Sequence, residues 1–181
     1  MAKKAASGVK STSDTTKSTA YNKRNWKALN SAETIWFYSK NSIFSNFGSY
    51  GFTCNGSVRY NTVEHYFQAC KFPYGSEEHL TIAMAATPRE AKRLGGPHGF
   101  RMSSEDTETW NTRRVDVMRD ALLMKAEQND EWRAALLETG TRWLVEDSPR
   151  DYFWGCGARG TGVNMLGQLL MELRAHLADR D

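Results

Sequence analysis

The 181-residue chain has no apolar run long enough for a signal peptide or a membrane-spanning helix. Its three cysteines (Cys54, Cys70 and Cys156) are widely spaced and form no CxxC pair, which favours free thiols in a reducing compartment over a disulfide framework. The four histidines form no HxxxH or HExxH pattern, and no Cys/His cluster has zinc spacing. We therefore expect a cytoplasmic protein without a metal, a cofactor or a membrane partner.

Acidic residues are nearly missing from the first 32 positions, where Asp14 stands against seven Lys or Arg side chains, a net charge of +6. The remaining 149 residues carry 17 basic and 20 acidic groups, so the excess of positive charge belongs to this segment. Tyr21 and Trp26 are its only large apolar anchors. We predict that residues 1–32 form a disordered basic arm, which either solubilises the chain or contacts nucleic acid or another polyanion.

Residues 33–178 carry strand signals first and mostly helix signals after them, which fit one compact domain. Residues 34–40 are β-branched and aromatic, and two short runs flank Asn55-Gly56, a strong hairpin signal. Helical periodicity and capping signals follow, with a possible strand between them. The predicted helices cover 63–72, 77–85, a segment from Pro88 to about Gly95, 110–128, 131–138 and 165–178, and the strand covers 143–146. We predict a helix-rich α+β domain with a small antiparallel N-terminal sheet.

The segment TVEHYFQACKF, residues 62–72, carries two stripes when it is read as a helix. Apolar residues recur at the spacing that buries one face, and Glu64, Gln68 and Lys71 repeat that spacing about a quarter-turn away. Glu64 follows the N-cap residue Thr62, where the helix dipole favours an ionised carboxylate. The polar stripe is either a solvated face or one side of an active site.

Two further features allow two interpretations each. Four glycines (155, 157, 160 and 162) lead into the last helix, so their loop is either a phosphate cradle at a helix N-terminus or a flexible connection without the GxxxxGK[ST] pattern. Trp110 stands among acidic residues at an expected helix start. Its ring either folds back onto the core or stacks on a base or sugar.

Five motifs follow one another in a fixed order: FYSKNSIFSNF, TVEHYFQACKF, ATPREAKRLG, a Trp-led helix and LVEDSPRDYFWGCGARGTGVNMLGQLLMELR. In this combination the chain resembles the NADAR family (YbiA-like N-glycosidases) from about Trp36 to Arg174. The resemblance implies a hydrolase that cleaves the N-glycosidic bond between a phospho- or ADP-ribose and a base or amine. Known family substrates are phosphoribosylamino-pyrimidine intermediates of riboflavin synthesis and ADP-ribosylated guanine, and the family is associated with NAD and ADP-ribose metabolism.

The resemblance also implies roles for individual residues. Glu64 matches the catalytic glutamate and Asp151 the second carboxylate. Lys71 could hold a phosphate, orient Glu64 or trap the ring-opened sugar as a Schiff base. Trp110 would stack on the base, Asn46 would bond a ribose hydroxyl or base edge, and the glycine loop with Arg159 would take the phosphate or pyrophosphate. The expected substrate-binding residues are Ser45, Asn46, Gln68, Trp110, Trp154, Gly155, Arg159, Gly160 and Asn164.

The chain departs from some of these enzymes at Cys156, where they carry an acid, and at Val163, where they carry a base. Because of these departures, the sequence predicts the type of reaction but does not identify the substrate. A non-catalytic ADP-ribose- or nucleotide-binding module is the alternative function, although such a module would not need both Glu64 and Asp151. A nucleic-acid-associated protein tethered by the basic arm is a third possibility.

Overall fold

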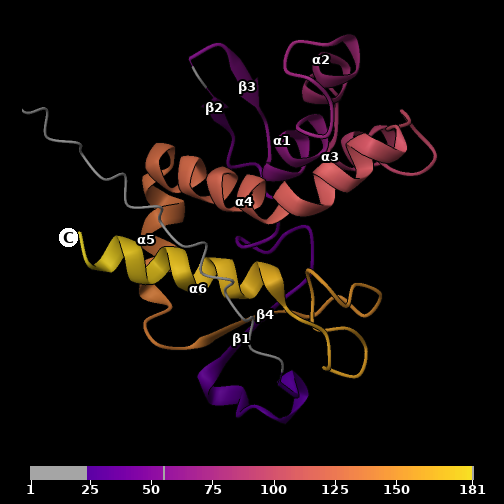
Figure 1. Ribbon diagram of the computed structural model, residues 1–181. Helices are drawn as coiled ribbons and strands as arrows, with labels where there is room; N and C mark the ends of the chain where they lie inside the picture. The colour runs from indigo at the N-terminus through magenta and orange to yellow at the C-terminus, as the bar shows by residue number, and fades with distance from the viewer. Residues whose placement is uncertain (1–23, 55, 181) are drawn as a thin grey trace, which may run out of the picture.

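The computed structural model describes residues 24–54 and 56–180, which form a helix-rich α+β domain (Figure 1). Two short 3₁₀ helices come first, followed by three strands, five α-helices, a fourth strand and a last α-helix. Their bounds are η1 Trp26–Ala28, η2 Ser31–Glu33, β1 Thr34–Phe37, β2 Phe52–Cys54, β3 Val58–Tyr60, α1 Val63–Ala69, α2 Glu77–Ala83, α3 Pro88–Leu94, α4 Ser104–Gln128, α5 Asp130–Glu138, β4 Trp143–Glu146 and α6 Met165–Ala178.

The predicted small antiparallel sheet near the N-terminus is present as the pair β2–β3, and the strand predicted at residues 34–40 belongs to a second pair. β2 and β3 form the expected antiparallel hairpin, with Phe52 opposite Tyr60. β1 instead pairs in parallel with β4, so that Phe37 lies opposite Glu146. The pattern of β1 could not reveal its partner, because the two strands are separated by more than a hundred residues. The parallel pair places β4 between β1 and α6.

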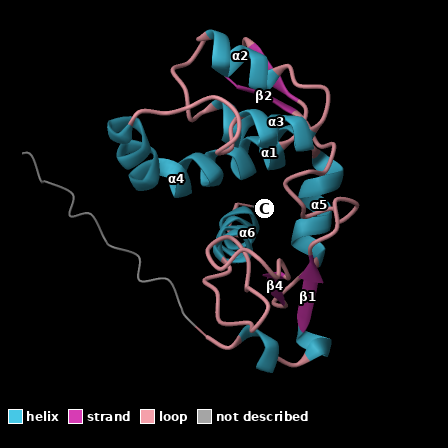
Figure 2. Ribbon diagram, turned by 90° about the vertical axis from the view of Figure 1, so that its right-hand side faces the viewer, coloured by secondary structure: helices cyan, strands magenta, loops and turns pink. Residues whose placement is uncertain are grey.

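The helices α4 and α6 lie between the other elements of the fold. α1, α2, α3 and the hairpin lie on one side of α4, and α6 runs between α4 and the β1–β4 pair (Figures 1 and 2). The predicted apolar face of α6 is confirmed, because Leu166, Leu169, Leu170, Leu173 and Leu177 are all buried. α6 therefore joins the strand pair to the helical part of the core.

The helix α4 begins earlier than the sequence suggested. Ser103 is its N-cap and accepts a hydrogen bond from the N–H of Asp106 (3.0 Å). The acidic residues before Trp110 are therefore the first turns of the helix, where they complement its dipole. Trp110 consequently lies inside α4 and not at its start.

The predicted arm does not extend over residues 24–32. Trp26 is buried, its indole N–H donates to the carbonyl of Gly162 (2.9 Å), and its ring meets Trp143 edge-on. The backbone N–H of Trp26 also donates to Gly160 (2.8 Å). Trp26 thus anchors residues 24–32, which the charge composition had placed in the arm. Residues 1–23 of the predicted arm lie outside the described residues.

No helix within residues 24–54 and 56–180 combines the length and the apolar character that crossing a membrane requires.

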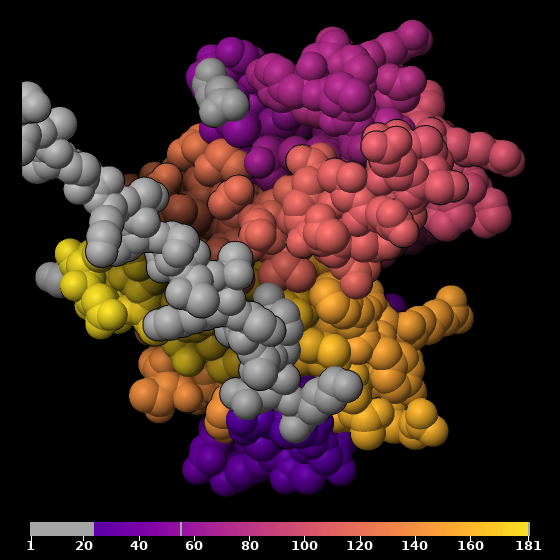
Figure 3. Space-filling view, in the orientation of Figure 1, coloured from indigo at the N-terminus to yellow at the C-terminus, as the bar shows by residue number. Residues whose placement is uncertain are grey.

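Figure 3 shows the orange loop between β4 and α6 beside the indigo segment of η1 and η2 on one face of the molecule. This neighbourhood agrees with the contacts of Trp26 with Gly160 and Gly162.

Lys125 of α4 is only 1% exposed, and its ammonium group lies 4.4 Å from the ring centre of Trp132 and 5.2 Å from that of Tyr50. Burial lowers the pKa of Lys125 to about 7 from 10.5. The unfolded chain thus holds more protons between pH 7 and 10.5, and the stability of the protein rises across this window. Below pH 7 the folded protein carries the full cost of the buried charge.

We expect Lys125→Met to raise the free energy of unfolding at pH 7 by about 1–3 kcal/mol, since one pKa unit corresponds to about 1.4 kcal/mol. This gain should shrink at pH 9.5, where the wild-type lysine is neutral in the fold. Urea denaturation at the two pH values measures both effects. Lys40→Met, at an exposed position, is the control, and an equal gain at both pH values would contradict the account.

Candidate active site

The polar stripe of α1 is buried, so the solvated-face interpretation is wrong. Glu64 is 6% exposed and Gln68 is 5% exposed, because α1 packs against α2, α3 and α4. Thr62 caps the helix and its hydroxyl accepts from the N–H of His65 (3.4 Å). The side-chain amide of Gln68 donates to Oε1 of Glu64 (2.8 Å). A carboxylate is therefore held in the core, with a neutral donor as its direct partner.

Opposing effects act on the ionisation of Glu64. Burial raises the pKa of Glu64 above its ordinary value, and the charge of Asp151 adds to that effect. Lys92, the Gln68 hydrogen bond and Lys71 act in the opposite direction and favour the ionised form. A buried acid between amines and a second carboxylate is typical of a catalytic group, because its proton affinity is tuned by neighbours.

Lys71 lies just beyond the C-terminal end of α1 and donates to the carbonyl of Gly95 (2.6 Å), the residue that follows α3. Burial lowers the pKa of the Lys71 amine, and the charge of Glu64 partly restores it. A lysine that gives up its proton more easily can act as a nucleophile, and a charged one can hold a phosphate or orient Glu64. All three predicted roles stay compatible with this position.

Asn46 and Ser45 lie in the loop before the hairpin, next to the start of α1. The backbone carbonyl of Asn46 accepts from the N–H of Glu64 (3.1 Å), while its side-chain oxygen is buried without a hydrogen bond from the described residues. The hydroxyl of Ser45 accepts from the N–H of Phe47 (3.2 Å) and so stabilises the turn. Asn46 is thus close to Glu64, and Ser45 shapes the loop that brings it there.

Asp151 fixes the turn of the WG motif. Its Oδ1 accepts from the N–H groups of Phe153 (2.9 Å) and Trp154 (2.7 Å). The ring of Trp154 packs edge-on against Phe67 of α1 (5.3 Å between ring centres). Asp151 therefore acts on Glu64 through its charge while one of its oxygens is used by the backbone of its own loop.

Trp110 is 6% exposed and its ring lies edge-on to Phe67, 4.9 Å away. It also lines a hollow of about 300 Å³ with Lys71, Arg113 and Tyr74. The Lys71 amine lies 5.9 Å and the Arg113 guanidinium 5.5 Å from the ring centre. Trp110 thus belongs to the core and borders a cationic, aromatic hollow, and its stacking on a base or sugar stays a prediction.

The loop that contains the four glycines is held by hydrogen bonds within the protein. Many of its N–H groups donate to carbonyls within the protein, among them those of Gly160, Gly162, Asn164 and Met165. A Cβ at Gly155 would lie 2.8 Å from the Cβ of Ser148, so glycine is required there for close packing. These N–H groups are not left for a phosphate. Arg159 lies on the outside of the loop, 6.0 Å from the ring of Tyr152.

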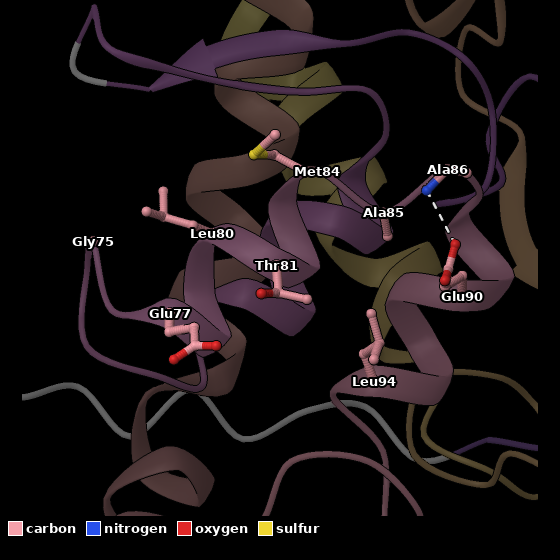
Figure 4. Close-up of a pocket in the computed structure, with 9 residues that line it drawn as sticks. All are labelled: Gly75, Glu77, Leu80, Thr81, Met84, Ala85, Ala86, Glu90 and Leu94. Atoms are coloured by element: carbon pink, nitrogen blue, oxygen red, sulfur yellow. Dashed lines mark hydrogen bonds between the residues drawn. The ribbon is translucent and has the colours of Figure 1, made fainter.

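A larger hollow of about 850 Å³ lies between α2 and α3 and involves none of the predicted catalytic residues (Figure 4). It is lined by Leu80, Met84 and Leu94 among others, and Glu90 accepts from the N–H of Ala86 (3.1 Å) at its edge. Glu64 lines neither this hollow nor the one beside Trp110. Size therefore does not identify the chemical centre of this molecule.

Comparison with known proteins supports the sequence resemblance. The profile of the NADAR domain matches residues 31–178. The chain belongs to the NADAR family. An N-glycosidase of Nostoc punctiforme is 40% identical over 151 residues, covering 80% of this chain and 92% of the relative. N-glycosidase YbiA of Escherichia coli is 41% identical over 147 residues, covering 80% and 88%.

The NMR structure of Escherichia coli YbiA matches with a TM-score of 0.71 and 36% identity, covering 87% of this chain and 93% of that one. It confirms the predicted α+β fold. The enzyme class that the sequence predicted, an N-glycosidase, is confirmed by these NADAR relatives. A maize riboflavin biosynthesis protein, PYRR, is 36% identical over 155 residues, and the matching part is 25% of its length.

Sequence reasoning missed two charged residues of this NADAR site, Lys92 and Glu146. Lys92 of α3 acts on both Glu64 and Glu146, and its amine lies 5.7 Å from the ring of Phe47. Burial, Asp151 and Glu64 raise the pKa of Glu146 to about 7, and Lys92 opposes them. The position of Glu146 at the end of a strand was the available signal.

No group of three or more His, Cys, Asp or Glu in the described parts of the chain is arranged to hold a metal ion.

Asn164 is fully buried in a left-handed conformation (φ 55°) directly before α6. Its Oδ1 accepts from the N–H of Glu146 (2.8 Å), and its Nδ2 donates to the carbonyl of Leu144 (2.9 Å). The predicted contact of Asn164 with substrate stays untested. Its amide is already used on both sides to fasten the start of α6 to β4.

We expect Asn164→Ala to lower the free energy of unfolding by about 2–4 kcal/mol, because two buried backbone groups lose their partners. Chemical denaturation measures the loss. Asn41→Ala, at an exposed loop position, should change stability by less than about 0.5 kcal/mol. A cost equal to that of the control would show that the Asn164 bonds do not hold β4 and α6 together.

Proposed function

We propose that this NADAR protein hydrolyses the N-glycosidic bond between a phospho- or ADP-ribose and a nitrogen base or amine. The buried Glu64, held by Gln68 and acted on by Lys71 and Lys92, is the observation that carries the proposal. Cleavage of such a bond passes through an oxocarbenium-like state that is positive at the anomeric carbon. An ionised Glu64 would stabilise this cation or take a proton from the attacking water.

The hollow beside Trp110 supports a substrate that carries both negative charge and an aromatic ring. Lys71 and Arg113 are cations that suit a phosphate, while Trp110 and Tyr74 offer aromatic surface. The names of the maize relative and of a Vibrio vulnificus relative point to riboflavin biosynthesis. Phosphoribosylamino-pyrimidines are therefore one substrate class that we propose, and ADP-ribosylated guanine, which the family resemblance implies, is the other.

A non-catalytic nucleotide-binding module is the second candidate. It is favoured by one observation: Glu64 is 6% exposed and lines neither hollow, so a ligand could occupy the site beside Trp110 without reaching it. For catalysis, side chains around Glu64 must move to admit the anomeric carbon. The two candidates differ in whether the substrate is turned over.

Glu64→Gln should lower the release of free base by about 10²- to 10⁴-fold, because the carboxylate that assists the reaction is lost while the fold is kept. Chromatography of the products, with ADP-ribosylated guanine oligonucleotide and a ribosylamino-pyrimidine phosphate offered side by side, measures the effect. Glu127→Gln, at an exposed position of α4, is the matched control. Binding without turnover by the wild type would favour the module, and undiminished turnover by Glu64→Gln would remove Glu64 from the mechanism.

We also propose that the basic N-terminal segment contacts nucleic acid. Residues 1–23 contain five lysines and one acid. Their deletion should weaken binding to an ADP-ribosylated oligonucleotide and flatten its salt dependence, while hydrolysis of a small phosphoriboside stays within about twofold. Filter binding at several salt concentrations measures this. Deletion of residues 1–30 is the contrasting variant, which should destabilise the fold because it removes Trp26. Equal salt slopes with and without residues 1–23 would contradict the proposed contact.

A further inference from the structure

The backbone of Glu146 is held in place at the end of β4. Its N–H donates to Oδ1 of Asn164 (2.8 Å), and its carbonyl accepts from the N–H of Cys156 (2.8 Å). β4 is itself paired with β1, where Glu146 lies opposite Phe37. A side chain on so constrained a backbone is well suited to a task that needs fixed geometry.

The carboxyl group of Glu146 has an unused oxygen. Its Oε2 is buried and receives no hydrogen bond within residues 24–54 and 56–180. The same is true of Oε1 of Gln68, a side chain that is 5% exposed and whose amide nitrogen holds Glu64. Buried polar atoms are rarely left without partners in a native protein. The side-chain oxygen of Asn46, next to the start of α1, is a third such atom. Three such oxygens on neighbours of Glu64 indicate a place where a ligand supplies the missing partners.

The three carboxylates have different surroundings. Glu64 has a hydrogen-bond donor in Gln68 and two lysines that favour its charge. One oxygen of Asp151 accepts two backbone N–H groups, so it is committed to its loop as an acceptor. Glu146 has Lys92 alone against burial and the charges of Asp151 and Glu64. Burial and the charges of the two other acids raise the pKa of Glu146 to about 7, so this carboxyl keeps a proton near neutral pH.

We propose that Glu146 is the general acid that protonates the departing base, a role for which its rigid backbone and unpartnered carboxyl oxygen equip it. This inference rests on the proposed hydrolysis. As the bond between C1′ and the base nitrogen breaks, its electron pair goes to that nitrogen, which takes the proton of Glu146. Water adds to C1′ and gives its proton to the carboxylate of Glu64. Transfer of this proton from Glu64 to Glu146 through solvent restores both groups.

This assignment separates the roles of the acids. Asp151 becomes a positioning residue, which shapes the turn of Trp154 and raises the proton affinity of its two neighbours. The substrate supplies hydrogen-bond donors to Gln68 through a ribose hydroxyl or an amino group of the base. Those donors are what a ribosylated purine or aminopyrimidine carries.

The test compares wild type, Glu146→Gln and the Glu127→Gln control on whichever of the two phosphorylated substrates the wild type cleaves. We expect kcat of Glu146→Gln to fall about 10²- to 10⁴-fold, with KM within about threefold. The wild-type rate should fall as the pH rises through about 7–8, because the acid loses its proton, and the variant should lack this alkaline decline. A ribosyl-pyridinium analogue has a leaving group that departs as a neutral molecule and needs no proton. On this analogue, Glu146→Gln should lower kcat by less than tenfold.

Each result decides between distinct outcomes. A wild type that releases no base from either substrate overturns the proposed hydrolysis and this role together. An active wild type with Glu146→Gln within threefold of its kcat overturns the role of Glu146 alone. If Glu146→Gln lowers kcat equally on the natural substrate and on the pyridinium analogue, the substitution acts through the structure of the site. That result also overturns the role of Glu146. Should Glu146→Gln not fold, a wild-type rate that stays level from pH 6 to pH 9 overturns the proposal.

Discussion

The burial of charged and polar groups at the start of α1 is the constraint on which the rest of this structure depends. A carboxylate removed from water is costly unless donors and cations compensate for the lost hydration. Here Gln68 supplies the donor, and Lys71 and Lys92 supply the positive charge. Because these three groups come from α1, its C-terminal end and α3, the two helices must be held closely and at a fixed distance.

Distant parts of the chain complete this arrangement. β4 ends at Glu146, and the following loop brings Asp151 and Trp154 toward α1. The loop is fixed by its own hydrogen bonds, by Asn164 against β4 and by Trp26 against Gly162. Several N–H groups of the residues that look most like a phosphate cradle in the sequence thus donate within the protein, among them that of Cys156 to the carbonyl of Glu146. A rigid loop is what a site with several interacting carboxylates requires.

The family assignment and the physical argument support each other at different levels. Similarity to N-glycosidases over the full domain establishes the family and the enzyme class. It does not say which acid holds which proton. The division of roles that we propose rests on the local surroundings, because a carboxyl with a donor and two lysines differs from one with an unpartnered oxygen.

The sequence by itself determined the local elements and singled out Glu64 as a candidate catalytic residue. Capping residues such as Thr62, the periodic leucines of α6 and the hairpin signal depend on neighbours along the chain, so they could be read directly. The parallel pairing of β1 with β4, the anchoring of Trp26 and the participation of Lys92 and Glu146 could not. Each depends on contacts between residues far apart in the chain, and an acid in a sequence has no fixed proton affinity. Only the tertiary structure, by burying one carboxyl oxygen of Glu146 and setting Asp151, Glu64 and Lys92 near it, decided that affinity.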